Sequence, residues 1–130
     1  MLKPEEIDHI NLVNWFNYEF PELKDDLHHF ANERYLIPQA NGGHWQIGRK
    51  LKRMQVTKGV ADFFLALPTN DSYGLWLELK VKGGRLSDEQ KEFLKRKSMR
   101  GYTSVSVIGF EAAKQIIMSY LEEYISNRIK

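Results

Sequence analysis

The chain has 130 residues, enough for one globular domain with a hydrophobic core but not for a separate substrate-binding domain, so we expect residues 1–130 to form a single domain. Its 42% hydrophobic and 28% charged residues are typical of a soluble folded protein, and it has no run of about 20 apolar residues that could span a membrane. The absence of cysteine excludes disulfides and thiolate metal sites, and we expect an intracellular protein.

The net charge of +2 hides an uneven distribution of charge along the chain. Residues 1–33 contain eight acids and two bases, whereas residues 49–100 contain thirteen Lys and Arg and six acids. A basic middle segment is what a phosphate backbone would attract, although an unevenly charged, solvated surface explains the same counts.

In the first half of the chain, apolar residues near helical spacing predict an opening helix over residues 5–19. A short segment follows at 23–29, and a brief strand is expected at 35–37. Beyond a turn at Asn41-Gly42-Gly43, residues 46–56 fit a short helix with a positively charged outer face.

In the second half, the apolar run 60–67 predicts a buried strand, and residues 73–81 predict its hairpin partner. A capping-box pattern starts a helix over residues 87–99. A third strand is expected at 102–108 and a long helix from 110 to about 125. This order predicts an α/β fold with a mixed central sheet flanked by helices.

Three charged residues lie within the two apolar strands. Strand alternation from Leu75 to Val81 places Trp76, Glu78 and Lys80 on one face. Asp62 lies sixteen residues before Glu78, in the strand expected to pair with this one. Such charges are costly to bury unless they pair, bind a metal or line an exposed site. They indicate either a functional site or a cross-strand ion pair between Lys80 and one of the acids.

Phosphodiester hydrolysis is the chemistry that suits two carboxylates and a lysine in this arrangement. Carboxylate oxygens hold a hard cation such as Mg²⁺, which lowers the pKa of a bound water. The lysine supplies positive charge near the phosphate.

Short motifs also occur in a recognisable order along nearly the whole chain. They are Glu5, His9 and Trp15 in the opening helix, Asn41-Gly42-Gly43, Leu51-Lys52, Gly59-Val60-Ala61-Asp62, Leu77-Glu78-Leu79-Lys80, Gly84-Arg85-Leu86-Ser87-Asp88-Glu89-Gln90 and Gly101-Tyr102. Together they resemble the VRR-NUC family of the PD-(D/E)XK nuclease superfamily, whose signature is D…(D/E)-x-K. The resemblance implies a restriction-endonuclease-like core, as in stand-alone phage or bacterial proteins. It also implies a Mg²⁺- or Mn²⁺-dependent endonuclease acting on branched DNA, such as a Holliday junction, or on flapped DNA.

Position by position, the resemblance makes Asp62 and Glu78 metal ligands and Lys80 the catalytic lysine. Gln90 matches a glutamine near the site, but it is also the fourth residue of the capping box and could serve only to start its helix. Glu5 matches the acid of the first helix that completes the site.

The opening helix and the strand around Asp62 contain an ambiguity and two departures from the family pattern. Glu6 is adjacent to Glu5, and either acid could instead complement the helix dipole. The family commonly has glutamine where this chain has His9, and usually proline where it has Ala61. We expect His9 to donate a hydrogen bond to a neighbouring carboxylate.

Seven residues are candidates for DNA contact, through either basic side chains or a close backbone approach; they are Asn41, Gly42, Gly43, Arg49, Lys52, Arg53 and Lys58. A solvated helix and an ordinary turn explain the same residues.

The expected partner is DNA. Because one small domain presents one active site, symmetric cutting of both strands predicts a homodimer. Two other classes remain open: a DNA-binding module with the same fold that does not cut, and a protein-interaction domain whose Glu78–Lys80 pair is structural.

Overall fold

A computed structural model describes residues 1–30, 53–55 and 57–129 of the chain. Its elements, in chain order, are α1 (Pro4–Glu19), the 3-10 helix η1 (Pro21–Asp26), β1 (Leu27–His29), β2 (Phe63–Leu65), β3 (Leu75–Lys80), α3 (Asp88–Met99), β4 (Thr103–Ile108) and α4 (Phe110–Ile129).

The described strands form one mixed sheet in the order β1-β2-β3-β4. The first two pairings are antiparallel, with Phe63 of β2 opposite Leu77 of β3. β3 and β4 are parallel, and α3 connects them. The predicted hairpin and the mixed α/β sheet are both confirmed.

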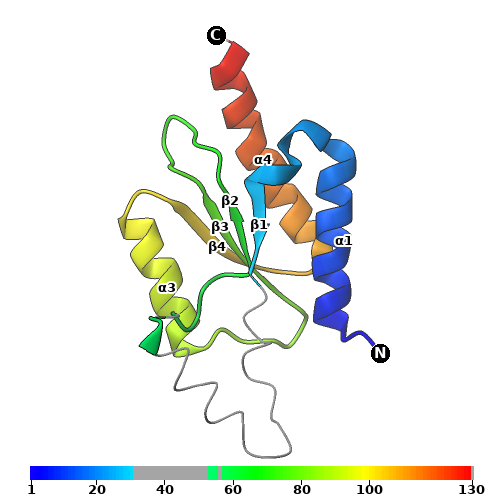
Figure 1. Cartoon of the computed structure of the whole chain (residues 1–130), viewed down its shortest axis with the longest axis vertical. Helices are drawn as coiled ribbons and strands as arrows, with labels where there is room; N and C mark the ends of the chain where they lie inside the picture. Colours follow the sequence, from blue (N-terminus) through cyan, green and yellow to red (C-terminus); the bar gives the residue numbers. More distant parts are fainter. Residues whose placement is uncertain (31–52, 56, 130) are drawn as a thin grey trace, which may run out of the picture.

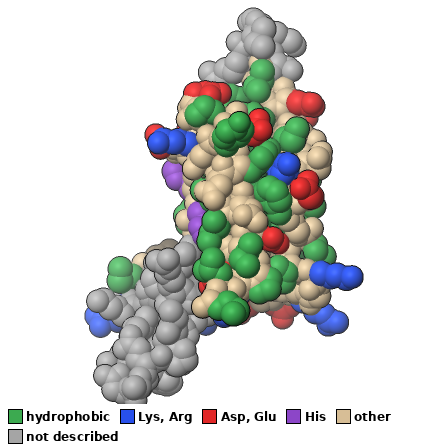
Figure 2. Space-filling view, turned by 90° about the vertical axis from the view of Figure 1, so that its right-hand side faces the viewer, with side chains coloured by type: hydrophobic (Ala, Val, Ile, Leu, Met, Phe, Trp, Pro, Cys, Tyr) green, Lys and Arg blue, Asp and Glu red, His purple; other side chains and the backbone are tan. Residues whose placement is uncertain are grey.

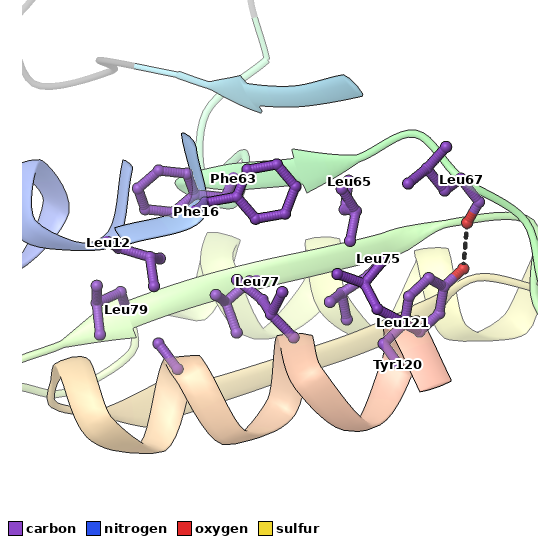
Figure 3. Close-up of a cluster of buried hydrophobic side chains, with 12 residues drawn as sticks. Leu12, Phe16, Phe63, Leu65, Leu67, Leu75, Leu77, Leu79, Tyr120 and Leu121 are labelled. Atoms are coloured by element: carbon purple, nitrogen blue, oxygen red, sulfur yellow. Dashed lines mark hydrogen bonds between the residues drawn. The ribbon is translucent and has the colours of Figure 1, made fainter. Parts of the chain in front are cut away.

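The sheet lies between helices. Figure 1 shows α1 and α4 on one side of the sheet and α3 on the other. The core fills the space between the sheet and helices α1 and α4 (Figure 3). Its buried side chains are Leu12, Phe16, Phe63, Leu65, Leu67, Leu75, Leu77, Leu79, Ala113, Ile117, Tyr120 and Leu121.

The alternation of β3 divides its side chains between the two layers. Leu75, Leu77 and Leu79 point into the core and are almost completely buried. Trp76 points to the α3 side, where it stacks on Phe64 with 4.3 Å between ring centroids and meets other aromatic rings edge-on. Because both faces of β3 are covered, its charged end residues are held within a well-packed strand.

Several element boundaries differ from those expected. The short segment at 23–29 divides into η1 and β1. The strand expected over 60–67 is limited to Phe63–Leu65. Backbone hydrogen bonds continue beyond both of its ends: the N–H of Phe30 donates to the carbonyl of Asp62 over 2.8 Å, and the N–H of Ala66 donates to the carbonyl of Asp26 over 2.9 Å. α4 extends to Ile129 rather than to about residue 125. The strand expected at 35–37 and most of the helix expected at 46–56 lie outside the described residues.

Among the described residues, no helix combines the length and the apolar character needed to cross a membrane.

Candidate active site

Asp62 and Glu78 meet at one end of the β2–β3 hairpin. The register that pairs Phe63 with Leu77 brings Asp62, the residue just before β2, beside Glu78. The N–H of Asp62 donates to Glu78 Oε1 over 3.2 Å, and the N–H of Leu79 donates to Asp62 Oδ2 over 2.9 Å. These side chains replace the backbone ladder at this end of the hairpin, so the two acids are fixed side by side.

Glu78 is the one buried charged residue among those described, and it is only 1% exposed. Its Oε2 accepts a hydrogen bond from Gln90 Nε2 over 3.1 Å and lies 3.2 Å from Lys80 Nζ. Burial, and then the negative charge of Asp62, raise the pKa of Glu78 to about 7, and the nearby Lys80 offsets only part of this rise. Two adjacent acids, one of them buried, favour the binding of a further positive charge.

Gln90 contacts both the N-cap residue of α3 and the buried acid Glu78. Its Oε1 accepts from the N–H of Ser87 over 2.9 Å, and its own N–H donates to Ser87 Oγ over 3.1 Å, which completes the predicted capping box of α3. Its amide nitrogen remains available for Glu78. The start of α3 is therefore coupled to the orientation of the buried acid.

Gly59 allows the segment before Asp62 to approach α3. It has a φ of +79°, and a Cβ at this position would lie 2.5 Å from the carbonyl carbon of Glu89 and 2.8 Å from the nitrogen of Gln90. A side chain would be strained by this backbone conformation and would also collide with the first turn of α3. Glycine at position 59 thus keeps Gln90 within reach of the acid pair.

Helix α1 brings a third acid and a histidine to Asp62. His9 Nε2 lies 3.4 Å from Asp62 Oδ2 and 3.9 Å from Oε1 of Glu5, one helical turn earlier. The neighbouring Glu6 caps the helix instead, because its Oε2 accepts from the N–H of Lys3 over 2.9 Å. Of the two adjacent glutamates, Glu5 is the one that faces Asp62.

The ring of His9 is also held from its other side. Its Nδ1 lies 3.1 Å from Nε2 of His29, which is exposed on β1. The His29 ring stacks on Phe63 with 4.6 Å between centroids. Burial lowers the pKa of His9, but contact with Asp62 and its negative charge outweigh burial and leave that pKa raised.

The donor atoms of Glu5, His9 and Asp62 all lie within 4.8 Å of one another. Around an ion with bonds of about 2.1 Å, neighbouring ligands are about 3 Å apart and opposite ligands about 4 Å apart, so small side-chain adjustments would let these three hold one divalent cation. His9 Nε2 is buried and has no hydrogen-bond partner, although it faces both carboxylates. The residues present therefore fit a divalent metal ion.

The structure brings together the five residues expected to form the catalytic site, which are Glu5, Asp62, Glu78, Lys80 and Gln90. Glu78 does not belong to the three grouped donors, and both of its oxygens are engaged by other groups, so its role as a ligand stays a prediction. From the sequence, His9 was expected only to donate a hydrogen bond, and His29 was assigned no role. The spacing of His9 four residues after Glu5 was a usable signal. His29 had none, because its place depends on the pairing of β1.

The candidate DNA-contacting residues are only partly described. Arg53 and Lys58 are exposed. The other five, Asn41, Gly42, Gly43, Arg49 and Lys52, lie outside the described residues.

A mixed sheet flanked by helices, with an acid pair and a lysine at the end of its central hairpin, defines a restriction-endonuclease-like α/β fold. The VRR-NUC domain model matches residues 21–110, and the chain belongs to the VRR-NUC family of nuclease domains. The matched range contains Asp62, Glu78, Lys80 and Gln90, whereas Glu5 and His9 precede it.

A solved structure described as a "VRR_NUC domain protein" has a similar fold. It is 21% identical in sequence, with a TM-score of 0.76 over 95% of this chain and 92% of that chain. No curated protein sequence matches the chain.

Proposed function

We propose that this chain is a divalent-metal-dependent endonuclease that hydrolyses phosphodiester bonds in DNA, with residues 1–130 acting as one nuclease domain. The observation that carries the proposal is the convergence of acids from α1, β3 and the start of β2 with Lys80 and Gln90 at one end of the sheet. Membership of the VRR-NUC family supports the same chemistry.

The acids are the proposed ligands of the metal ion, and a backbone N–H orients one of them. Asp62 and Glu5 would hold a Mg²⁺ or Mn²⁺ ion, with Glu78 as a further predicted ligand. When bound, the ion supplies positive charge to the phosphate and lowers the pKa of a water molecule. The N–H of Leu79 fixes one oxygen of Asp62, so that carboxylate is oriented before any ligand arrives.

Lys80 supplies the second positive charge. Its side chain is 15% exposed, so the ammonium group is covered but can still contact a phosphate oxygen. In the free protein it lies against Glu78; with substrate present it orients the attacking water or neutralises the charge that develops on the phosphate. Gln90 keeps Glu78 in place while the contacts of Lys80 change.

The substrate we propose is branched DNA, either a Holliday junction or a flap, which rests on the resemblance in sequence to the VRR-NUC family. Arg53 and Lys58 contribute positive charge for phosphate contacts, so binding should weaken steeply as salt is raised.

We also propose a homodimer, because one site per chain cuts both strands symmetrically only if two chains are related by a twofold axis. Exposed apolar side chains on α1 and α4 are available for such an interface; they are Ile7, Ile10, Tyr18, Met118 and Ile125. Figure 2 shows hydrophobic side chains distributed over the face that includes α1. Sedimentation at several protein concentrations tests this, and a monomer at all of them would exclude the dimer.

Comparing Asp62→Asn with Asp71→Asn tests the nuclease function. Asp71 lies in the exposed turn between β2 and β3, far along the hairpin from Asp62, so its variant is a matched control. We expect Asp62→Asn to lose metal-dependent cleavage and keep DNA binding, while Asp71→Asn keeps both. Tight, salt-sensitive binding with no cleavage by the wild type under any metal would identify a non-catalytic DNA-binding module instead.

A further inference from the structure

We propose that His9 is a nitrogen ligand of the metal ion, oriented by His29, and that it makes this site select Mn²⁺ over Mg²⁺. This inference rests on the proposed function only in expecting a divalent ion at Asp62. It concerns His9, for which the sequence predicted only a hydrogen bond.

The His9 ring lies against two carboxylates. Its Nε2 is buried without a hydrogen-bond partner and lies 3.4 Å from Asp62 Oδ2 and 3.9 Å from Glu5 Oε1. This nitrogen makes no hydrogen bond and only long ion-pair contacts with the two carboxylates, so its bonding capacity is poorly satisfied in the metal-free protein. A cation between the ring and the two carboxylates would use the lone pair of Nε2 and both acids at once.

His29 contacts the other nitrogen of the His9 ring. For Nε2 to offer its lone pair, Nδ1 must carry the proton, and His29 Nε2 is 3.1 Å from Nδ1 as an acceptor. Histidine ligands in proteins commonly donate their second ring N–H in this way, which fixes both tautomer and orientation. The stacking of His29 on Phe63 and its place opposite Phe63 in the β1–β2 pairing hold that acceptor in position.

Mg²⁺ and Mn²⁺ differ in their preference for nitrogen ligands. Mg²⁺ binds oxygen ligands almost exclusively in proteins and keeps several waters, whereas imidazole is an ordinary ligand for first-row transition ions. A glutamine at position 9 would present only an amide oxygen or an N–H. Replacing it by histidine therefore increases affinity for Mn²⁺ more than affinity for Mg²⁺.

The test uses the full chain with Mn²⁺ alone and reads ¹⁴N coupling to the ion by pulsed electron paramagnetic resonance. We expect coupling in the wild type and in His28→Gln, whose side chain is exposed on the same strand as His29, and no coupling in His9→Gln. Labelling the wild type with ¹⁵N-histidine should change the coupling, which identifies a histidine nitrogen without any substitution.

Calorimetry then measures selectivity. We expect His9→Gln to weaken Mn²⁺ binding about tenfold or more while changing Mg²⁺ binding much less, and His29→Ala to weaken Mn²⁺ binding with the ¹⁴N coupling retained. Mn²⁺ bound without nitrogen coupling, coupling that persists in His9→Gln, or no Mn²⁺ binding would each overturn the inference. Because these readouts need no DNA, cleavage without nitrogen coupling refutes only this inference, and nitrogen coupling without cleavage refutes only the nuclease function.

Discussion

Replacing Glu78 by glutamine should make the metal-free protein more tolerant of high pH. Burial and the charge of Asp62 raise the pKa of Glu78 from 4.5 to about 7. The folded chain therefore binds this proton more readily than the unfolded chain does. Its contribution to stability is fully present below pH 4.5 and is lost as the pH rises through about 7.

The size of the effect follows from the pKa. One pKa unit corresponds to about 1.4 kcal/mol, so the ionised Glu78 should cost about 3 kcal/mol of unfolding free energy by pH 8. Glutamine cannot ionise, and the hydrogen bonds that it fails to reproduce are missing at every pH. The difference between Glu78→Gln and wild type should therefore shift in favour of the variant by about 3 kcal/mol between pH 4.5 and pH 8.

The assay is urea unfolding in EDTA at a series of pH values, with Glu92→Gln as the matched control. Glu92 is 61% exposed, so its substitution by glutamine makes the same chemical change without removing a buried carboxyl group. Mn²⁺ or Mg²⁺ should restore wild-type stability at pH 8, because the ion compensates the acids. A variant that instead loses stability relative to wild type as the pH rises would show that Lys80 keeps Glu78 ionised in the folded protein.

Two further substitutions test how the chain positions the site. Gly59→Ala should destabilise the protein by at least about 2 kcal/mol more than Gly83→Ala, and it should impair cleavage. Both glycines have positive φ, but only at Gly59 would a Cβ collide with α3. Equal losses of stability in urea unfolding would exclude the clash. Tyr120→Phe should lower the free energy of unfolding by about 1 to 2 kcal/mol, because it removes the 2.6 Å hydrogen bond from the hydroxyl to the carbonyl of Leu67 (Figure 3). Cleavage should be kept, and Tyr18→Phe, at an exposed tyrosine, should leave stability unchanged. Unchanged stability in Tyr120→Phe would show that this hydrogen bond does not stabilise the fold.

Local sequence patterns were sufficient for the central part of the fold and site. The alternation of side chains along β3 separates its leucines from Glu78 and Lys80. The apolar run around Asp62 predicts the strand that pairs with β3. The capping-box pattern locates the start of α3 and, with it, Gln90. Each of these signals is contained within a few consecutive residues, which explains why they could be recognised without the structure.

Features that depend on contacts between distant segments could not be predicted in this way. β1 has only three residues, two of them histidines, and becomes a strand because β2 offers it a partner. The partnership of His9 with His29 requires α1 and β1 to lie on the same side of the acid pair, which no spacing reveals. Glu5 and Glu6 are distinguished by their contacts in the folded chain, because Glu6 caps the helix whereas Glu5 lies beside His9.

Cleavage of a labelled four-way junction, a flap and a plain duplex in Mg²⁺, Mn²⁺ or EDTA tests the proposed nuclease site. Wild type is compared with Lys80→Ala and with Lys82→Ala, an exposed lysine two residues further along as a matched control. We predict metal-dependent cutting of branched substrates by wild type and Lys82→Ala, with a loss of about 100-fold or more in Lys80→Ala. Equal cutting by Lys80→Ala and wild type, or cutting that persists in EDTA, would contradict the proposed active site.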